Sequence, residues 1–413
     1  MLVPARETCF RKRKHGTHTA ISGPRALGMA ANRMPTEPTS AEHARIFVFL
    51  ACIVAASVGG YALRRLGWAK REWAPRLMSA AIIGVDSPIA LLAVWYLAIQ
   101  ADVWKVPVAG AIVAVATSLA GLEIGRRLRL PPQDRAVFGL QGGMGNVGYT
   151  LGGALCFALW GIQGLALEQM FCVMWPFYAF LFCFPIARHY GEQAAGSPRE
   201  KPAVRGGTAG LAPPCVSHGR PLQSRRAGTR PGKAGRATRA PKPSALRYAA
   251  GVLLRSLTDL RSLPLYMVML GLVLNVRGVA PPDVIRRWHV IDSLMVLGII
   301  LQFGGVGLTV EARRLPAFWK PALGTAALKF LLSPALMLGA ALLLGLSGVP
   351  LYVCVLLAAM PTALYSVLMA NIFGLNKDLA NATFILTHLV CLGLVLAAIV
   401  VWGAGGLRAL VGG

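Results

Sequence analysis

Charged residues are scarce in this sequence. They account for 14% of the 413 residues, whereas a soluble protein carries about 25%. Hydrophobic residues make up 55% of the chain, and the mean hydropathy is +0.58. This composition is not that of a soluble enzyme, and it predicts an all-α, polytopic membrane protein.

Motifs for cofactor or enzyme chemistry are also missing. The eight cysteines form no CxxC pair and most lie in apolar segments, so we interpret them as small buried hydrophobic residues and expect no metal or other cofactor. No GxxxxGK[ST] or HExxH motif occurs, which argues against ATP-driven transport and zinc-dependent hydrolysis. Ser366 has no glycine elbow around it, so an intramembrane serine protease is not favoured.

Positive charge, in contrast, is in large excess. The net charge is +26 and the pI is about 10.7, but no nucleic-acid-binding motif accompanies it, and we expect no nucleic-acid partner. Lys and Arg instead gather in alternate loops between apolar stretches, as the positive-inside rule describes. The pattern predicts a multi-pass protein of the inner (plasma) membrane. Both termini are predicted outside, and the central basic linker is predicted to be cytoplasmic and in contact with anionic membrane lipids.

Ten membrane spans are predicted, five on each side of that linker, and most are near the ~20 residues that a bilayer requires. The predicted spans are residues 46–66, 77–97, 106–124, 136–160, 168–186, 263–276, 291–309, 321–344, 351–373 and 380–402. The two five-helix halves then occupy residues 46–186 and 251–404. The remaining parts are a disordered basic tail, a disordered basic linker and a C-terminal tail, at residues 1–45, 187–250 and 405–413. The basic tail lacks the apolar core of a secretory signal.

The ninth span holds Pro361 at its centre. Proline has no backbone N–H and disturbs the preceding helical turn, so the freed carbonyls need other partners within a membrane. Thr362 and Ser366 follow within about one turn, and their hydroxyls can lie beside the break. A helix broken in this way is typical of a transporter's substrate site. A simple proline kink packed against its neighbours is the alternative.

The fourth span is interrupted differently. Six glycines occur within residues 142–153, with Asn146 among them. Glycine costs about 1 kcal/mol relative to alanine in a helix interior, so a break or a close helix crossing is predicted around Gly145 and Gly148. Packing of small residues is the alternative, although the Asn146 amide requires hydrogen bonds. Two antiparallel broken helices would cross near the middle of the membrane, where helix N-termini suit a small anion.

Three short stretches of the sequence form a recognisable combination. They are residues 59–67 at the end of the first span, 145–148 in the fourth, and 358–363 with Ser366, Ala370, 374–376 and Thr387 in the last two spans. Together they resemble the auxin efflux carrier family of membrane transport proteins, over residues 46–402 apart from the linker. The resemblance implies ten helices in an inverted five-helix repeat, a crossover of the fourth and ninth helices, transport of organic anions, and a dimer. It extends to the bile-acid/sodium symporter superfamily.

Two positions depart from that family. The family usually has a proline in the fourth span shortly after the asparagine, where this chain has Gly153. It often has an asparagine after the ninth-span proline, where this chain has Tyr365. The expected fold is unaffected, but the substrate and the coupling ion stay open. A sodium-coupled symporter of the bile-acid type is therefore an alternative.

Three ionisable residues lie within predicted spans. Asp86 directly precedes Ser87-Pro88 in the second span, where a charged carboxylate costs at least ~3 kcal/mol. We predict that it couples proton or cation binding to transport or takes part in gating, and a structural role in capping or pairing is the alternative. Lys329, in the eighth span, is the candidate partner of Asp86 or a contact for an anionic substrate, with snorkelling as the alternative. His388, in the last span, is expected to be a packed, hydrogen-bonded residue rather than a proton relay.

These observations favour a secondary transporter, or permease, of a small organic anion such as a carboxylate, working by alternating access. The predicted substrate contacts are Gly145, Asn146, Gly148, Lys329, Pro361, Thr362 and Ser366. Asp86 is the predicted ion-coupling residue, for H⁺ or Na⁺. A membrane sensor or scaffold that signals through the basic linker is the alternative. The chain is not expected to be an enzyme.

Overall fold

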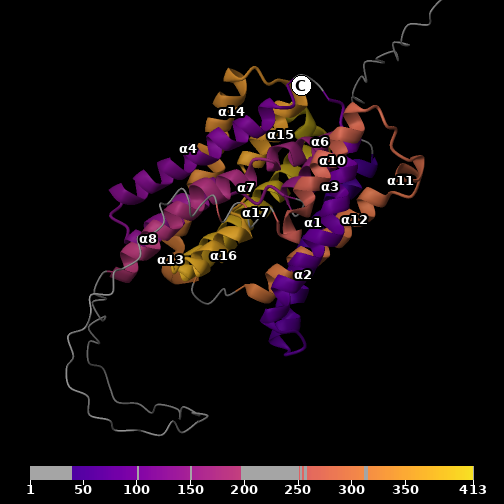
Figure 1. The fold of residues 1–413 in the computed structure, drawn as a ribbon. Coiled ribbons are helices and arrows are strands. Elements are labelled where there is room, and N and C mark those ends of the chain that lie inside the picture. Colours follow the sequence, from indigo (N-terminus) through magenta and orange to yellow (C-terminus); the bar gives the residue numbers. More distant parts are fainter. Residues whose placement is uncertain are drawn as a thin grey trace, which may run out of the picture.

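The computed structural model describes residues 40–99, 102–148, 151–196, 251, 254, 258–310 and 315–412. In these ranges all regular structure is helical and no strand occurs (Figure 1). The prediction of an all-α protein is confirmed. Most of the predicted basic tail and basic linker lies outside the described residues. The parts that are described continue helices, because α1 begins at Ser40 and α8 ends at Gly196.

Each half of the chain supplies a series of helices. The first half forms α1 (Ser40–Arg65), α2 (Ala74–Ala81), α3 (Ser87–Trp95), α4 (Lys105–Arg127), α5 (Pro132–Gly143), α6 (Gly152–Cys172), α7 (Trp175–Phe177) and α8 (Phe184–Gly196). The second half forms α10 (Leu263–Val276), α11 (Asp283–Arg287), α12 (Val290–Thr309), α13 (Leu315–Ala327), α14 (Ser333–Leu343), α15 (Gly348–Ala358), α16 (Leu364–Ile372) and α17 (Lys377–Gly412). The halves are interleaved, since α1 packs along α12 and α10 packs against α3 (Figure 1).

Within the described residues, three helical stretches contain a wide π-helical turn, and each turn ends two residues before a proline. The turns are Ile82–Asp86, Tyr178–Cys183 and Leu328–Leu332, and the prolines are Pro88, Pro185 and Pro334. Because proline has no N–H with which to close an α-helical turn, the backbone widens ahead of it. In the first turn, the Ser87 N–H and hydroxyl both donate to the Ile82 carbonyl. The Ile82 carbonyl therefore keeps hydrogen-bond donors, and the helix continues through the turn.

Within the described ranges, seven helical segments are long and apolar enough to cross a membrane. This is fewer than the ten predicted spans, for three local reasons. The ninth span is divided at its break into two short helices, and α10 has only 14 residues. The fourth span is also divided, and its second part is continuous with the fifth span in α6. The ten-helix inverted repeat therefore stays a prediction.

A turn at Gly161 separates the two parts of α6. Its φ of 60° and ψ of −148° suit glycine, which has no Cβ to clash. The chain folds back there, so that a Cβ placed on Gly153 would lie 3.1 Å from Oε2 of Glu168. The fifth span was predicted to begin at Glu168. In the structure its helix begins just after Gly161, which puts Glu168 inside the helix and fully buried.

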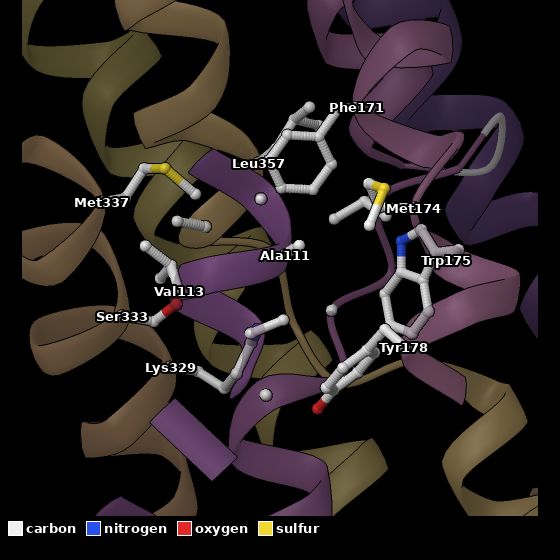
Figure 2. A pocket seen from close by; sticks show the side chains of 16 residues that line it. Ala111, Val113, Phe171, Met174, Trp175, Tyr178, Lys329, Ser333, Met337 and Leu357 are labelled. Atoms are coloured by element: carbon white, nitrogen blue, oxygen red, sulfur yellow. The ribbon is translucent and has the colours of Figure 1, made fainter. Parts of the chain in front are cut away.

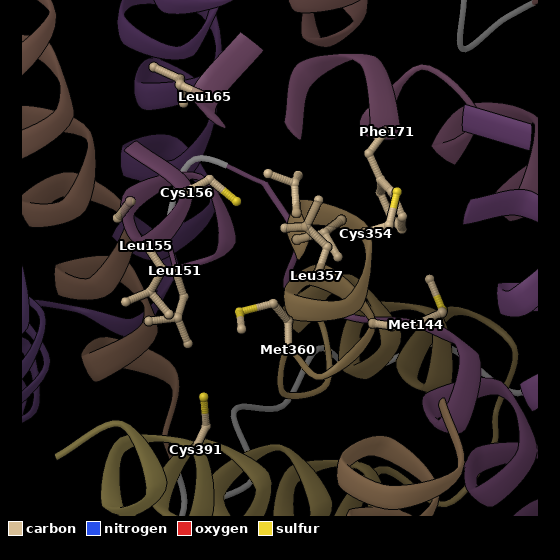
Figure 3. Close-up of a cluster of buried hydrophobic side chains, with 14 of the residues drawn as sticks. Met144, Leu151, Leu155, Cys156, Leu165, Phe171, Cys354, Leu357, Met360 and Cys391 are labelled. Carbon is tan, nitrogen blue, oxygen red and sulfur yellow. The ribbon is translucent and has the colours of Figure 1, made fainter. Parts of the chain in front are cut away.

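The outer surface suits a lipid environment. Large apolar side chains such as Val58, Leu331 and Leu343 are exposed on it, which is expected of helices that face hydrocarbon rather than water. Inside, Leu155, Met360 and Cys391 belong to a buried apolar cluster that lies around the ends of the broken helices (Figure 3). This cluster encloses the segments that form the candidate site.

Candidate substrate-binding site

The two interruptions predicted from the sequence are both present, and they lie against each other. The chain is non-helical between α5 and α6 and again between α15 and α16. These two segments run antiparallel and pair at Gly145 and Thr362. The Asn146 N–H donates to the Pro361 carbonyl at 2.6 Å, and the Ala363 N–H donates to the Met144 carbonyl at 3.0 Å. The backbone groups freed by each break are thus partly satisfied by the other, as a membrane requires.

The extended backbone at this crossing directs alternate residues to opposite sides. Gly143, Gly145 and Val147 line a pocket, whereas the intervening Asn146 side chain reaches α17. We call these sides the pocket face, which comprises Gly145 and Val147 with Lys329, and the α17 face, which comprises Asn146 and Thr362 with their partners on α17. Residues that the sequence analysis combined in one site are therefore divided between two faces.

Figure 2 shows the pocket between two groups of side chains. Phe171, Trp175 and Tyr178 stand on one side, and Lys329 and Ser333 stand on the other. The cavity is small, about 30 Å³, which is room for one or two water molecules. A larger ligand can enter only if the surrounding helices move apart.

Lys329 is the only cation that lines this pocket among the described residues. It comes from the π-helical turn before Pro334, is 2% exposed, and its Nζ lies 3.0 Å from the position that a Cβ on Gly145 would occupy. In the part of the chain that the structure describes, it forms no hydrogen bond or ion pair. A buried ammonium without a counter-charge is costly, so the pocket is suited to an anion.

Two hydroxyls lie beside Gly143, the last residue of α5. The Ser118 and Tyr178 oxygens are 2.6 Å apart. A Cβ on Gly143 would lie 2.1 Å from Ser118 Oγ and 2.2 Å from Tyr178 Oη, so only glycine fits at this position. Neither hydroxyl is predicted from the sequence, because a single Ser or Tyr in an apolar span carries no distinguishing signal.

On the α17 face, polar groups are paired with one another. The Asn146 Nδ2 lies 3.2 Å from the His388 Nε2, and the Thr362 Oγ1 lies 3.1 Å from the Thr387 Oγ1. Thr387 Oγ1 also accepts a hydrogen bond from the Thr362 N–H at 3.2 Å. His388 is therefore hydrogen-bonded, as expected. These contacts hold the crossing against α17.

The other predicted contact residues have structural partners. Ser366 Oγ accepts from the Gln141 amide at 3.0 Å and donates to the Ala363 carbonyl at 2.6 Å. Gly148 accepts from the Gly153 N–H at 2.9 Å, which starts α6. Neither Ser366 nor Gly148 lines the pocket. In this arrangement the Ser366 hydroxyl joins the two broken helices.

Asp86 lies apart from the pocket, and its partner differs from the one predicted. Both carboxylate oxygens accept from Gln302 Nε2 of α12, at 2.9 and 3.0 Å, and no ion pair with Lys329 forms. The prediction that Lys329 is the partner of Asp86 is wrong, because Lys329 points to Gly145 instead. Asp86 does not cap the following helix either.

Glu168 is a second buried carboxylate, and it is close enough to Asp86 to interact with it electrostatically. Its oxygens accept from the Gln169 amide and, at 2.9 Å, from the Cys172 thiol. Gly153, the position at which the family usually has proline, leaves room for Glu168. Glu168 is not predicted from the sequence, because the predicted fifth span begins at this residue, and a carboxylate at the end of a span contacts water.

Comparison with known protein families shows which family part of this chain matches. No curated protein matches this chain. The family model described as "Membrane transport protein" matches residues 255–399. The match includes Lys329, the ninth-span break and His388, whereas the glycine-rich fourth span lies outside it. The resemblance noted in the sequence is confirmed for this stretch, and the chain is a multi-pass membrane protein. Residues 255–399, the second half of the helical bundle, carry a membrane transport protein domain, the domain of the auxin efflux carrier family.

Proposed function

We propose that this protein is a secondary transporter of a small organic anion and that the carboxylate of the anion binds Lys329. The observation that carries the proposal is the buried Lys329 ammonium, which has no partner among the described residues and stands beside the crossing at Gly145. An anion that pairs with it would remove the cost of the isolated charge. The hydroxyls of Tyr178 and Ser333 line the same pocket and can donate further hydrogen bonds.

The rest of the pocket suits an apolar substrate body. Phe171, Trp175 and Met337 line it, and Lys329 is the one cation among its described residues. A second carboxylate would enter this apolar surface without a counter-charge, which is unfavourable. We therefore expect a monocarboxylate with an apolar body to be preferred over a dicarboxylate.

Transport by alternating access requires that the pocket open to each side in turn. At about 30 Å³ the cavity is too small for such a substrate, so the helices around it must move apart before one can bind. The two broken helices are joined at their crossing by two backbone hydrogen bonds, and α14 follows a wide π-helical turn. Such breaks and π turns are the usual points of bending in helices.

The decisive test is uptake into proteoliposomes of radiolabelled mono- and dicarboxylates, with and without pH and Na⁺ gradients. Lys329→Met should abolish accumulation, because the anion loses its counter-charge. The control is Lys320→Met, which removes an exposed lysine from α13 and should leave uptake unchanged. No uptake of any anion by folded wild-type protein would reject the proposal and favour the membrane sensor or scaffold.

We propose proton coupling at Asp86, with Glu168 as the neighbouring carboxylate. Two buried carboxylates that interact with each other are not both readily ionised, so one of them is a natural proton carrier. Asp86→Asn should abolish the pH dependence of uptake, while the amide can still bond to Gln302. If uptake by Asp86→Asn keeps its pH dependence, Asp86 takes no part in coupling. If uptake follows the Na⁺ gradient instead, a symporter of the bile-acid type is supported.

A further inference from the structure

A second cavity shares the lining residue Trp175 with the pocket that holds Lys329 but extends away from it. Its volume is about 180 Å³, several times that of the first pocket. One wall is the end of α6 with α7, and the other is the start of α10. Neither Lys nor Arg is among the described residues that line it. An anion is therefore not the occupant that this cavity suits.

This cavity reaches the side chains that hold Glu168. Gln169 and Cys172 line it, and both donate hydrogen bonds to the Glu168 carboxylate, the thiol at 2.9 Å. Glu168 itself is fully buried, so these two side chains stand between its carboxylate and the cavity. A water molecule that took the place of the Cys172 thiol would contact Oε1 directly.

Asp86 approaches the same region from the second wall. The π-helical turn Ile82–Asp86 contacts both α10 and the short 3-10 turn Leu260–Ser262 that precedes α10. Asp86 interacts electrostatically with Glu168, and so do the thiols of Cys156 and Cys172. The cavity thus lies beside a cluster of titratable groups that belong to both walls.

The start of α10 gives water a way into this cavity. The 14 residues of α10 span about 21 Å, whereas the hydrocarbon core of a membrane is about 30 Å thick. The polar residues Thr258, Asp259 and Ser262 lie just before α10, and Ser262 lines the cavity. Polar chain within a membrane is accommodated where it lines a water-filled space, and this cavity has room for several water molecules.

We propose that this cavity holds water and is the route by which protons reach Glu168 and Asp86. Gln169 and Cys172 are the side chains that separate the water from the carboxylate. The proposal rests on the proton coupling proposed above. In each transfer a hydronium ion in the cavity gives its proton to an ionised carboxylate, which becomes a neutral carboxylic acid, and a water molecule is left. Proton release is the reverse of this step.

Two leucines on α10 provide a matched test of whether the cavity holds water. Leu265 lines it and is half-buried, whereas Leu270 is 42% exposed and does not line it. Leu265→Cys and Leu270→Cys are reconstituted in liposomes, with the charged thiol reagent sulfonatoethyl methanethiosulfonate on both sides of the membrane. Leu265→Cys should react at least about tenfold faster, because a thiol reacts as its thiolate, which forms in water and not in hydrocarbon.

Peptide mass spectrometry measures the modification at each position, so the native cysteines do not interfere. An unchanged Tm shows that each variant is folded. A rate for Leu265→Cys that is equal to or below that of Leu270→Cys would overturn the proposal, because the cavity would then hold lipid or be closed to water.

A second readout follows Glu168 itself. The infrared C=O band of a protonated carboxylic acid shifts when deuterium replaces its proton, so the rate of this shift in D₂O at low pH measures the access of water. Loss of the band in Glu168→Gln identifies it. Leu265→Trp should slow the exchange by about tenfold, since the larger side chain excludes water from the cavity, and Leu270→Trp should not.

Equal exchange rates in the two Trp variants would show that water arrives by another path, and would overturn the assignment of this cavity. Neither measurement depends on transport. If uptake by the wild-type protein ignores the pH gradient, proton coupling fails, while the labelling and exchange rates still decide whether water reaches Glu168 through this cavity.

Discussion

The two faces of the crossing share one stretch of backbone but differ in how their polar groups are satisfied. On the α17 face, Thr362 is paired with Thr387 and Asn146 with His388. On the pocket face, Lys329 has no partner among the described residues. A satisfied buried hydrogen bond contributes little net stability, whereas an unsatisfied buried charge is costly. The α17 face therefore maintains the shape of the crossing, and the pocket face retains the capacity to bind.

The largest expected effect on stability comes from removing the unsatisfied charge. Lys329→Met replaces the ammonium by an apolar group of similar length, so the free energy of unfolding should rise by about 1–4 kcal/mol while uptake is lost. Thermal unfolding in detergent measures the change, with Lys320→Met as the control. A lower Tm for Lys329→Met would contradict the assignment, since it would mean that the ammonium stabilises the closed bundle.

The opposite result is expected on the α17 face. Thr387→Val leaves the Thr362 N–H and hydroxyl without the partner they have now, and the free energy of unfolding should fall by about 1–3 kcal/mol. Thr383→Val is the matched control, because Thr383 lies one turn earlier on α17, is equally buried, and its hydroxyl has no partner. Denaturation of the two variants should differ clearly. Equal free energies of unfolding for Thr387→Val and Thr383→Val would show that the hydrogen bonds of Thr387 do not stabilise the fold.

The smallest effect is a displacement of the ammonium. Gly145→Ala would bring a methyl group 3.0 Å from the Lys329 Nζ, and this flexible end can shift by a few tenths of an ångström. We expect a nearly unchanged Tm but a KM raised by about threefold to tenfold, since a charge-assisted contact is weakened. Gly339→Ala, on α14 with open space around it, is the control. An unchanged KM for Gly145→Ala would place the substrate elsewhere.

The sequence predicts the secondary structure correctly where one residue type determines the backbone conformation. Pro361 and the glycines around Asn146 predicted two breaks, and both are present, since proline and glycine are unfavourable in a helix interior. The apolar runs predicted an all-helical chain, because a membrane leaves the backbone few other options. The positions of the long spans followed from the same runs.

Two features of the site could not be predicted, and both depend on where elements end. The turn at Gly161 moved Glu168 from a predicted helix end to a buried interior. The extended backbone at the crossing directs Gly145 and Asn146 to opposite sides, and the predicted break did not specify its backbone conformation. Contacts such as His388 with Asn146 join distant parts of the chain, and no local pattern contains them.

The two broken helices are connected by backbone hydrogen bonds, and this affects which amino-acid substitutions the protein can accept. Every residue carries a backbone carbonyl, and every residue except proline carries an N–H. The bonds from Asn146 to Pro361 and from Ala363 to Met144 therefore survive most substitutions of the side chains around them. Substrate preference can then be altered on the pocket face while the architecture stays the same. This is consistent with a chain that differs at Gly153 and Tyr365 from the family it resembles, yet has the crossing.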